Sequence, residues 1–237
     1  MSVIIIGLKK LNSKWRSSGS ERMVKLLQGD CLKMLSTVSD GSADLIVTDP
    51  PYGMDYSCKW RKDYGKGDKL KNDTNLDWLD EFAQLCYDKL ADNSAAYVFC
   101  SFHHIDKFKQ AFEKVFKFKN ILVWEKNNTS MGDLKGDFAS KTEFIILVHK
   151  GRCLLRGRRD HNILKFDRTR NTLHPTQKPV DLLEFLISKF SDEGDLVLDP
   201  FMGSGSTGEA CKNTGRHFIG IELDEKHFNT AKTRLKS

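Results

Sequence analysis

Short apolar runs alternate with amphipathic stretches along most of this chain. In Trp78–Leu90, in Ile105–Val115 and after Pro179, apolar residues recur at the three- to four-residue spacing that predicts helices. A more polar helix is expected over Glu225–Leu235. The runs that predict strands are Met23–Leu27, Leu45–Thr48, Ala95–Cys100, Ile121–Trp124, Glu143–Val148, Leu196–Leu198 and Phe218–Ile221. This alternation is typical of an α/β fold, in which helices cover both faces of a mainly parallel sheet.

The length and composition fit one folded domain. A chain of 237 residues with 39% hydrophobic and 10% aromatic residues can bury a substantial core, and no linker divides it. We expect residues 1–22 to form a flexible arm, because they are polar and basic after one apolar run, and residues 23–237 to form the domain. No apolar run reaches the ~18 residues of a membrane span. The six cysteines include no Cys-x-x-Cys pair, so we expect reduced thiols in a cytoplasmic protein and no metal site.

The tetrapeptide Asp49-Pro50-Pro51-Tyr52 directly follows a predicted strand, which is where open α/β sheets bind their ligands. An aromatic amine is a poor nucleophile, because its lone pair is delocalised into the ring. The Asp49 carboxylate and the Pro50 carbonyl can accept both amino hydrogens and draw the nitrogen toward tetrahedral geometry. The prolines stiffen the turn, and Tyr52 offers a stacking face for an extruded base. The alternative is an ordinary turn, since Asp and Pro are common turn residues.

A glycine-rich turn, Gly203-x-Gly205-x-x-Gly208, follows a later predicted strand. Such a turn lets backbone approach a nucleotide-like ligand, and Glu222, at the end of the next strand, suits the ribose hydroxyls. The spacing also fits a nicotinamide dinucleotide. Two observations favour S-adenosylmethionine instead. Only 29 residues (237 less 208) follow Gly208, too few for a second dinucleotide half, and Asp199 would repel a pyrophosphate but could pair with an α-amino group.

Two further polar residues lie beside these predicted strand ends. Lys178, in the segment His174–Pro179 ahead of the Leu196–Leu198 strand, is a candidate partner for the methionine carboxylate of the cofactor. Asp30 follows the first predicted strand and offers another carboxylate. An N-cap for the helix that follows is an equally good interpretation of Asp30.

The two motifs in this order resemble the β group of DNA amino-methyltransferases, in which the catalytic motif precedes the cofactor motif. The resemblance extends from about residue 23 to the C-terminus. Asp49-Pro-Pro-Tyr52 matches the family's catalytic motif in full, and Phe201-x-Gly203-x-Gly205 matches its cofactor loop. The resemblance implies a Rossmann-like, S-adenosylmethionine-dependent methyltransferase fold. It also implies a circularly permuted, seven-stranded mixed sheet in the order 3-2-1-4-5-7-6, with one antiparallel strand.

The resemblance assigns roles to single residues. Asp30 falls where the family contacts the cofactor adenine, and Glu222 where it holds the ribose. The candidate catalytic residues are Asp49, Pro50, Pro51 and Tyr52. The candidate cofactor-binding residues are Asp30, Asp49, His174, Lys178, Asp199, Phe201, Gly203, Gly205, Ser206, Thr207, Glu222 and Leu223. Only the segments at about 128–142 and 151–173 are available for target recognition, which favours a short recognition site or relaxed specificity.

Two basic segments are candidates for contact with DNA. Residues 151–172 hold seven arginines and lysines against two aspartates, and this surplus of +5 is nearly the whole chain's +6. Residues 53–75 form a long basic loop after the catalytic tetrapeptide. The alternative for the arginine-rich segment 151–172 is a solvated basic loop. The candidate DNA-binding residues are Lys59, Arg61, Lys62, Lys126, Arg152, Arg156, Arg158, Arg159, Arg168 and Arg170.

We therefore expect a methyltransferase that moves a methyl group from S-adenosylmethionine directly to the N6 amino group of a flipped-out adenine in double-stranded DNA. Cytosine N4 is the first alternative, although the acidic first residue of the tetrapeptide resembles adenine enzymes more. A nicotinamide-dependent oxidoreductase and an inactive DNA-binding protein are further alternatives. Cytosine C5 methylation needs a cysteine nucleophile, typically after proline, and no Pro-Cys occurs. The family is typically bacterial or phage-encoded, which allows a restriction endonuclease companion and either a monomer or a homodimer.

Overall fold

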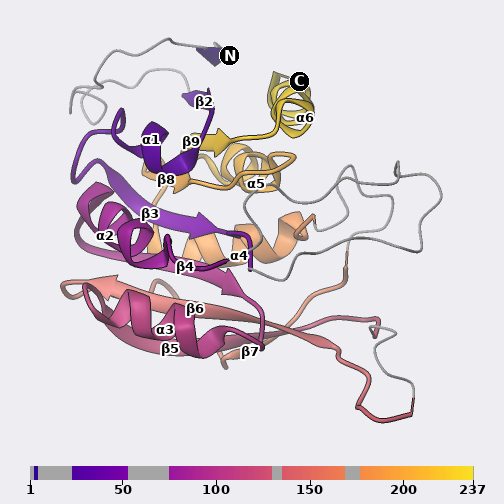
Figure 1. The fold of residues 1–237 in the computed structure, drawn as a ribbon. Coiled ribbons are helices and arrows are strands. Elements are labelled where there is room, and N and C mark those ends of the chain that lie inside the picture. The colour runs from indigo at the N-terminus through magenta and orange to yellow at the C-terminus, as the bar shows by residue number, and fades with distance from the viewer. Residues whose placement is uncertain (1–2, 5–22, 53–74, 130–134, 169–176, 237) are drawn as a thin grey trace.

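A mixed sheet lies between two layers of helices (Figure 1). The computed structural model describes residues 3–4, 23–52, 75–129, 135–168 and 177–236. The strands are β1 (Val3–Ile4), β2 (Val24–Gln28), β3 (Ala43–Thr48), β4 (Leu90–Cys100), β5 (Lys117–Glu125), β6 (Thr142–Lys150), β7 (Ile163–Lys165), β8 (Leu196–Asp199) and β9 (His217–Glu222). The helices are α1 (Cys31–Leu35), α2 (Leu79–Lys89), α3 (Ile105–Glu113), α4 (Val180–Phe190), α5 (Ser206–Thr214) and α6 (Glu225–Lys236).

The described strands form one sheet in the order β1-β2-β9-β8-β3-β4-β6-β5-β7. If β8, which precedes the glycine turn, is counted as the first strand, the central seven follow the expected order 3-2-1-4-5-7-6. β6 is antiparallel to β4 and β5, and the other described pairs are parallel. The predicted permuted topology is therefore confirmed. β1 and β7 are short parallel strands that flank the central seven as the first and last strands of the sheet. They were not predicted, because two or three residues carry no readable periodicity.

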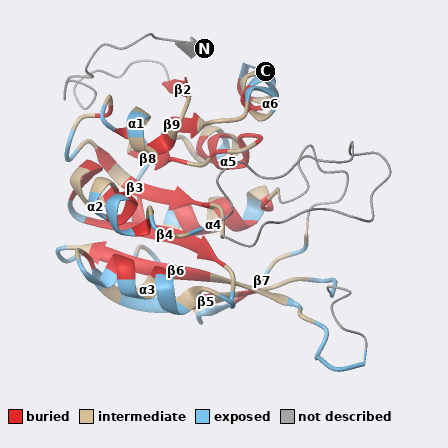
Figure 2. Cartoon of the chain, in the orientation of Figure 1, coloured by how far each residue is buried: buried red, intermediate tan, exposed pale blue. Residues whose placement is uncertain are grey.

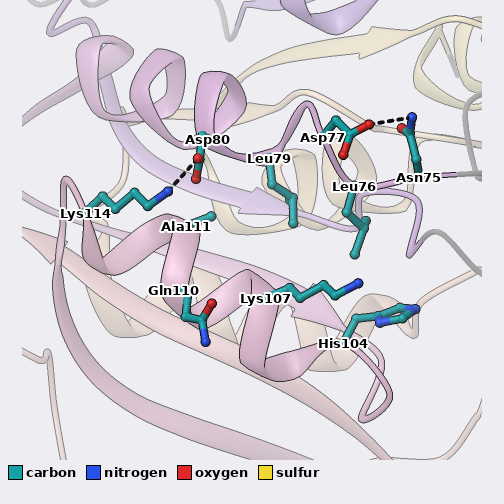
Figure 3. Close-up of a pocket in the computed structure, with 10 residues that line it drawn as sticks. All are labelled: Asn75, Leu76, Asp77, Leu79, Asp80, His104, Lys107, Gln110, Ala111 and Lys114. Carbon is teal, nitrogen blue, oxygen red and sulfur yellow. Dashed lines mark hydrogen bonds and ion pairs between the residues drawn. The ribbon is translucent and has the colours of Figure 1, made fainter.

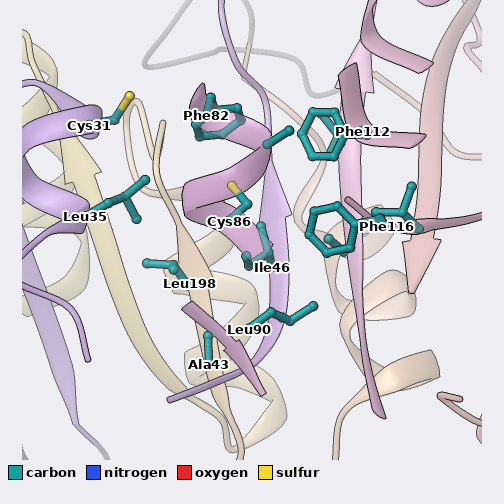
Figure 4. Close-up of a cluster of buried hydrophobic side chains, with 14 of the residues drawn as sticks. Cys31, Leu35, Ala43, Ile46, Phe82, Cys86, Leu90, Phe112, Phe116 and Leu198 are labelled. Carbon is teal, nitrogen blue, oxygen red and sulfur yellow. The ribbon is translucent and has the colours of Figure 1, made fainter. Parts of the chain in front are cut away.

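Strand side chains alternate between two apolar cores, one on each face of the sheet. On one face, α1, α2 and α3 cover Ile46 and Val98; on the other, α4, α5 and α6 cover Leu45 and Tyr97. Figure 4 shows part of the first core, with Phe82 of α2 among its buried side chains. Figure 2 shows buried strands between helices whose outer faces are exposed. Because each large apolar side chain contributes roughly 1.5–3 kcal/mol when fully buried, these two cores hold in place the sheet that carries the site.

Helix boundaries follow local signals in the sequence. Pro179 lies at the N-cap of α4 with extended backbone, one residue before the expected first turn. Within the expected arm, Val3 pairs in parallel with Val24. The rest of residues 1–22 lie outside the described residues, so the arm stays a prediction. None of the helices in the described ranges is long and apolar enough to cross a membrane.

Candidate active site

Four neighbouring parallel strands each lead into a carboxylate at the same edge of the sheet. In the spatial order β2, β9, β8, β3, these carboxylates belong to Asp30, Glu222, Asp199 and Asp49. β3 and β8 pair directly, so the catalytic tetrapeptide and the glycine turn leave adjacent strands. The structure thus places two motifs that are far apart in the sequence side by side, at the edge where open α/β sheets bind ligands.

Both carboxylate oxygens of Asp49 have partners. The Tyr52 hydroxyl donates to Oδ1, and the Lys178 ammonium lies 2.7 Å from Oδ2. The Tyr52 ring packs edge-on against Phe108 of α3, with a centroid distance of 6.4 Å. Asp49 and Tyr52 are each half-buried, so the tetrapeptide packs against the fold and is still partly exposed.

Lys178 joins Asp49 to a second carboxylate, that of Glu143. Its Nζ lies 3.0 Å from Glu143 Oε2 and 3.5 Å from the Tyr52 hydroxyl oxygen. The same nitrogen lies 5.0 Å from the centroid of the Phe99 ring. The sequence assigned Lys178 to the methionine carboxylate of the cofactor; the structure places its ammonium against the catalytic carboxylate.

Glu143 was not among the predicted site residues, and the antiparallel strand brings it there. β6 begins at Thr142 and runs against β4, so Phe144 pairs with Cys100 at the end of β4. Lys126, which follows β5, lies 3.3 Å from Glu143 Oε1. The only sequence signal for Glu143 is an acidic residue at the start of an apolar run. That signal becomes informative once the direction of the strand is known.

Burial and charge together set the protonation of this network. Burial acts to lower the pKa of Lys178, but the carboxylates of Asp49 and Glu143 outweigh it and raise that pKa, so the ammonium keeps its proton. Burial raises the pKa of Asp49 against the opposing effect of Lys178. Burial also acts to raise the pKa of Glu143, but Lys178 and Lys126 hold that pKa below its ordinary value. Two cations therefore face two carboxylates.

The glycine turn is open at one glycine and tightly packed at another. Gly203 and Gly205 have φ angles of +53° and +84°, which favour glycine. A Cβ at Gly203 would meet no atom of the described structure within 4 Å, whereas one at Gly205 would lie 3.1 Å from Cβ of Ala231 in α6. Both glycines were expected to leave room for a ligand. At Gly205 the missing side chain makes room for α6, and its contact with the cofactor stays a prediction.

Glu222 and Asp30 both accept backbone hydrogen bonds. Glu222 accepts from the N–H of Gly203 at 3.0 Å and from that of Asp224 at 2.7 Å, so it links β9 to the glycine turn. Burial raises the pKa of Glu222. Asp30 accepts from the N–H of Leu32 at 3.0 Å and is the N-cap of α1, which was one of its two interpretations. Its contact with the cofactor adenine stays a prediction.

Asp199 is the most deeply buried carboxylate of the row, with 2% of its surface exposed. Burial raises its pKa to about 7, although hydrogen bonds from Thr207 and from the Phe201 N–H act to lower it. The nearby charge of Asp49 adds to the increase. A buried carboxyl group in this state would be stabilised in its ionised form by a bound cation.

The other predicted cofactor residues lie at or near the glycine turn. The Phe201 ring packs against Trp78 and Phe82, at centroid distances of 5.7 and 5.3 Å. Ser206 and Thr207 are buried in the first turn of α5, and Leu223 is half-buried after β9. The candidates outside the described residues are His174, Lys59, Arg61, Lys62 and Arg170.

The basic segment after β6 begins at the edge of the sheet opposite the one that carries Asp49. Because β6 is antiparallel, its last residue, Lys150, pairs with Ser94, six residues or ~20 Å along β4 from the end where Asp49 lies. There the Arg152 N–H donates to Asn93 at 3.0 Å. The DNA-binding expectation for this part of the segment is therefore not supported by its position.

The other described arginines of the segment divide between the two edges. Arg156 makes two hydrogen bonds of 2.6 Å with Asp192, which precedes β8. Arg158 lies nearby, with its carbonyl 2.8 Å from Nζ of Lys189 in the last turn of α4, and Arg159 follows it as an exposed residue. β7 then returns parallel to β5, and the Arg168 N–H donates to Asn127 Oδ1 at 3.2 Å, beside Lys126. Arg168 and Lys126 thus lie at the edge of the catalytic tetrapeptide.

A cavity of about 620 Å³ opens between α3 and the residues that lead into α2 (Figure 3). Its lining residues are Asn75, Leu76, Asp77, Leu79, Asp80, His104, Lys107, Gln110, Ala111 and Lys114. None of the predicted site residues is among them. One contact connects this region to the tetrapeptide: Phe108, which lies in α3 between lining residues Lys107 and Gln110, packs against Tyr52.

Known proteins resemble this chain over most of its length. A family model for DNA methylases, covering N6 and N4 methyltransferases, matches residues 43–165 and 156–233. The type II methyltransferase M2.DpnII of Streptococcus pneumoniae is 31% identical over 243 residues, covering 90% of this chain and 89% of the relative. The DNA adenine methyltransferase YhdJ of Escherichia coli (strain K12) is 28% identical over 246 residues, covering 89% and 82%. The solved M1.HpyAVI–SAM complex has a TM-score of 0.69 and 31% identity, covering 90% of this chain and 100% of that one.

Proposed function

Because the chain belongs to the family of DNA methylases, we propose that it transfers a methyl group from S-adenosylmethionine to the N6 amino nitrogen of adenine in DNA. The observation that carries the proposal is the position of Asp49. This half-buried carboxylate accepts a hydrogen bond from Tyr52. It directly follows β3, and β3 pairs with β8, the strand that leads into the glycine turn. An amino group held there would face a methyl donor bound at the neighbouring strand end.

The tetrapeptide supplies the acceptors that an aromatic amine needs. Asp49 accepts one amino hydrogen and the Pro50 carbonyl accepts the other, which draws the nitrogen lone pair out of the ring and toward the donor. Tyr52 stacks on the base. When bound, S-adenosylmethionine supplies an electrophilic methyl group on a positively charged sulfur. As the nitrogen gains the methyl group it loses a proton, and Asp49 is the base within reach of that proton.

The residues at the glycine turn fit this methyl donor. The side of Gly203 where a Cβ would lie is free of atoms of the described structure, so backbone can approach the ligand there. The buried Asp199 carboxyl is suited to an α-amino cation, and Glu222 to the ribose hydroxyls. The family match sets aside the nicotinamide-dependent alternative.

Adenine is the proposed base for two reasons. The acidic first residue of the tetrapeptide, Asp49, resembles the adenine enzymes of the family, and the relative YhdJ is named as a DNA adenine methyltransferase. Cytosine N4 presents a similar amino group and remains the second candidate, because the family includes methylases of both bases. A cytoplasmic location and a restriction endonuclease companion remain predictions.

Modification-sensitive sequencing of DNA from a methylation-deficient bacterial host that expresses the protein tests this function. We expect N6-methyladenine in one short sequence context, and none in a host that expresses Asp49→Ala. N4-methylcytosine would transfer the assignment to cytosine. Unmodified DNA from a host with well-folded wild-type protein would refute the proposal.

A further inference from the structure

The catalytic carboxylate is already engaged on both oxygens. Tyr52 donates to Oδ1 of Asp49, and the Lys178 ammonium lies 2.7 Å from Oδ2. An adenine amino hydrogen must bond to one of these oxygens before the base can react, and the Lys178 cation competes with it for Oδ2. Tyr52 belongs to the same rigid turn, whereas Lys178 comes from a different part of the chain. The ammonium is therefore the partner that gives way.

A displaced ammonium at this position needs another anion. The Lys178 side chain is only 9% exposed, and a buried cation without a counter-charge is strongly destabilising. Glu143 Oε2 is enclosed by protein atoms and lies 3.0 Å from the same Nζ. Lys126, 3.3 Å from Oε1, fixes the other end of that carboxylate. Lys178 can thus give up Asp49 and keep Glu143 as its charge partner, since both carboxylates already lie within 3.0 Å of the same Nζ.

We propose that Glu143 is a positioning residue that takes over the Lys178 ammonium when the target base binds to Asp49. The inference rests on the proposed function, since it concerns the same amino group and the same carboxylate. With Glu143 present, the cation has two carboxylates within reach and releases one of them to the base. Without it, Asp49 is the sole described carboxylate paired with Lys178, and the base must compete with a buried ion pair.

This arrangement predicts that a second substitution, at Lys178, restores part of the methylation rate that a substitution of Glu143 removes. Glu143→Gln should slow methylation, because the ammonium then stays on Asp49. Adding Lys178→Met to that variant should restore part of the rate, because the competing cation is gone. If Glu143 merely supported the fold, the second substitution would leave the rate unchanged or lower it further.

The experiment is single-turnover methylation of duplex DNA at saturating S-adenosylmethionine and DNA, with melting temperature and cofactor affinity measured on the same samples. We expect Glu143→Gln to be about 100-fold slower than the wild type, the loss that misplacement of groups at a reacting centre can cause. The double variant should be about tenfold faster than Glu143→Gln. Glu143→Asp, which keeps the charge, should regain part of the rate, and it keeps the test open if Glu143→Gln folds poorly.

Glu125→Gln is the matched control. Glu125 ends the neighbouring strand and pairs with Lys141 and Lys165 at 3.2 and 3.5 Å, but it has no ion pair with Lys178. Its substitution should leave the rate unchanged. A Glu143→Gln rate equal to that of the wild type, or a double variant no faster than Glu143→Gln, would overturn the inference. A wild-type protein that does not methylate DNA in this assay would instead overturn the proposed function.

Discussion

Lowering the pH from 8 to 5 should weaken S-adenosylmethionine binding through the protonation of Asp199. This carboxyl group is 2% exposed, and burial raises its pKa to about 7. Its proposed partner is the α-amino group of the cofactor, which stays protonated below its ordinary pKa of ~8. Binding therefore requires the ionised carboxylate, and protons compete with the cofactor for it.

The size of the effect follows from the fraction of Asp199 that is ionised in the free protein. With a pKa of about 7, that fraction falls from about 0.9 at pH 8 to about 0.01 at pH 5. About half of the amino group has lost its proton at pH 8, so the affinity should be nearly equal at pH 8 and pH 7. It should then fall by about 45-fold, or ~2.3 kcal/mol, between pH 7 and pH 5. The stability of the free protein should change in the opposite sense. Because the folded pKa lies above the ordinary value of 3.8, the folded state binds more protons, and the contribution of Asp199 to stability declines as the pH rises from about 4 to 7.

Calorimetric titration of S-adenosylhomocysteine, which carries the same amino acid end, measures this dependence at pH 5, 6, 7 and 8. Asp199→Asn is the control: it should bind weakly and with little change over the same range. Glu222, whose pKa is also raised by burial, remains in that variant. Any change of affinity with pH that persists in Asp199→Asn therefore reports on Glu222 at the proposed ribose site. An affinity of the wild type that does not change with pH, or an equal slope in Asp199→Asn, would refute the assignment of Asp199.

Three further predictions follow from the geometry. Gly203→Ala should lower cofactor affinity in calorimetry more than it lowers the melting temperature, whereas Gly205→Ala, whose Cβ would press on α6, should do the reverse. Arg156→Ala should leave the salt dependence of DNA binding unchanged and cost ~0.2–1 kcal/mol of stability, since Arg156 pairs with Asp192. Arg168→Ala should reduce the slope of log affinity against log salt concentration by about one unit. Tyr52→Ala should lose stacking worth roughly 1–3 kcal/mol. Tyr52→Phe should be milder, because it keeps the ring and loses only the hydroxyl contacts with Asp49 and Lys178; equal methylation rates for the two variants would contradict this.

The sequence predicted those parts of the fold and site that depend on local patterns. The apolar runs located the seven central strands within a few residues of their observed bounds, and the family resemblance supplied their order. Asp49 and Asp199 each follow such a run, and parallel strands bring their ends to one edge. The burial of Asp199, which raises its pKa, could not be read from the sequence, because it depends on how the neighbouring strands and α5 pack around it.

The direction of one strand explains most of what the sequence analysis missed. A strand has the same apolar pattern whichever way it runs, so the run at Glu143–Val148 did not show which of its ends meets the active edge. β6 runs antiparallel, which brings Glu143 to Lys178 and carries Arg152 and Arg156 to the opposite edge. The ion pair between Lys178 and Asp49 was likewise missed, because it joins residues whose separation in the sequence carries no pattern.

The central claim is transfer of a methyl group to adenine N6, and nucleoside analysis of treated DNA tests it most directly. Purified protein is incubated with unmethylated duplex DNA and S-adenosylmethionine that carries an isotope-labelled methyl group, and the digested nucleosides are separated and identified by mass spectrometry. We predict label in N6-methyldeoxyadenosine for the wild type. We predict none for Asp49→Ala, although that variant still binds the cofactor. Label in N4-methylcytosine would contradict the choice of base, and unlabelled DNA with a folded, cofactor-binding wild type would contradict the account as a whole.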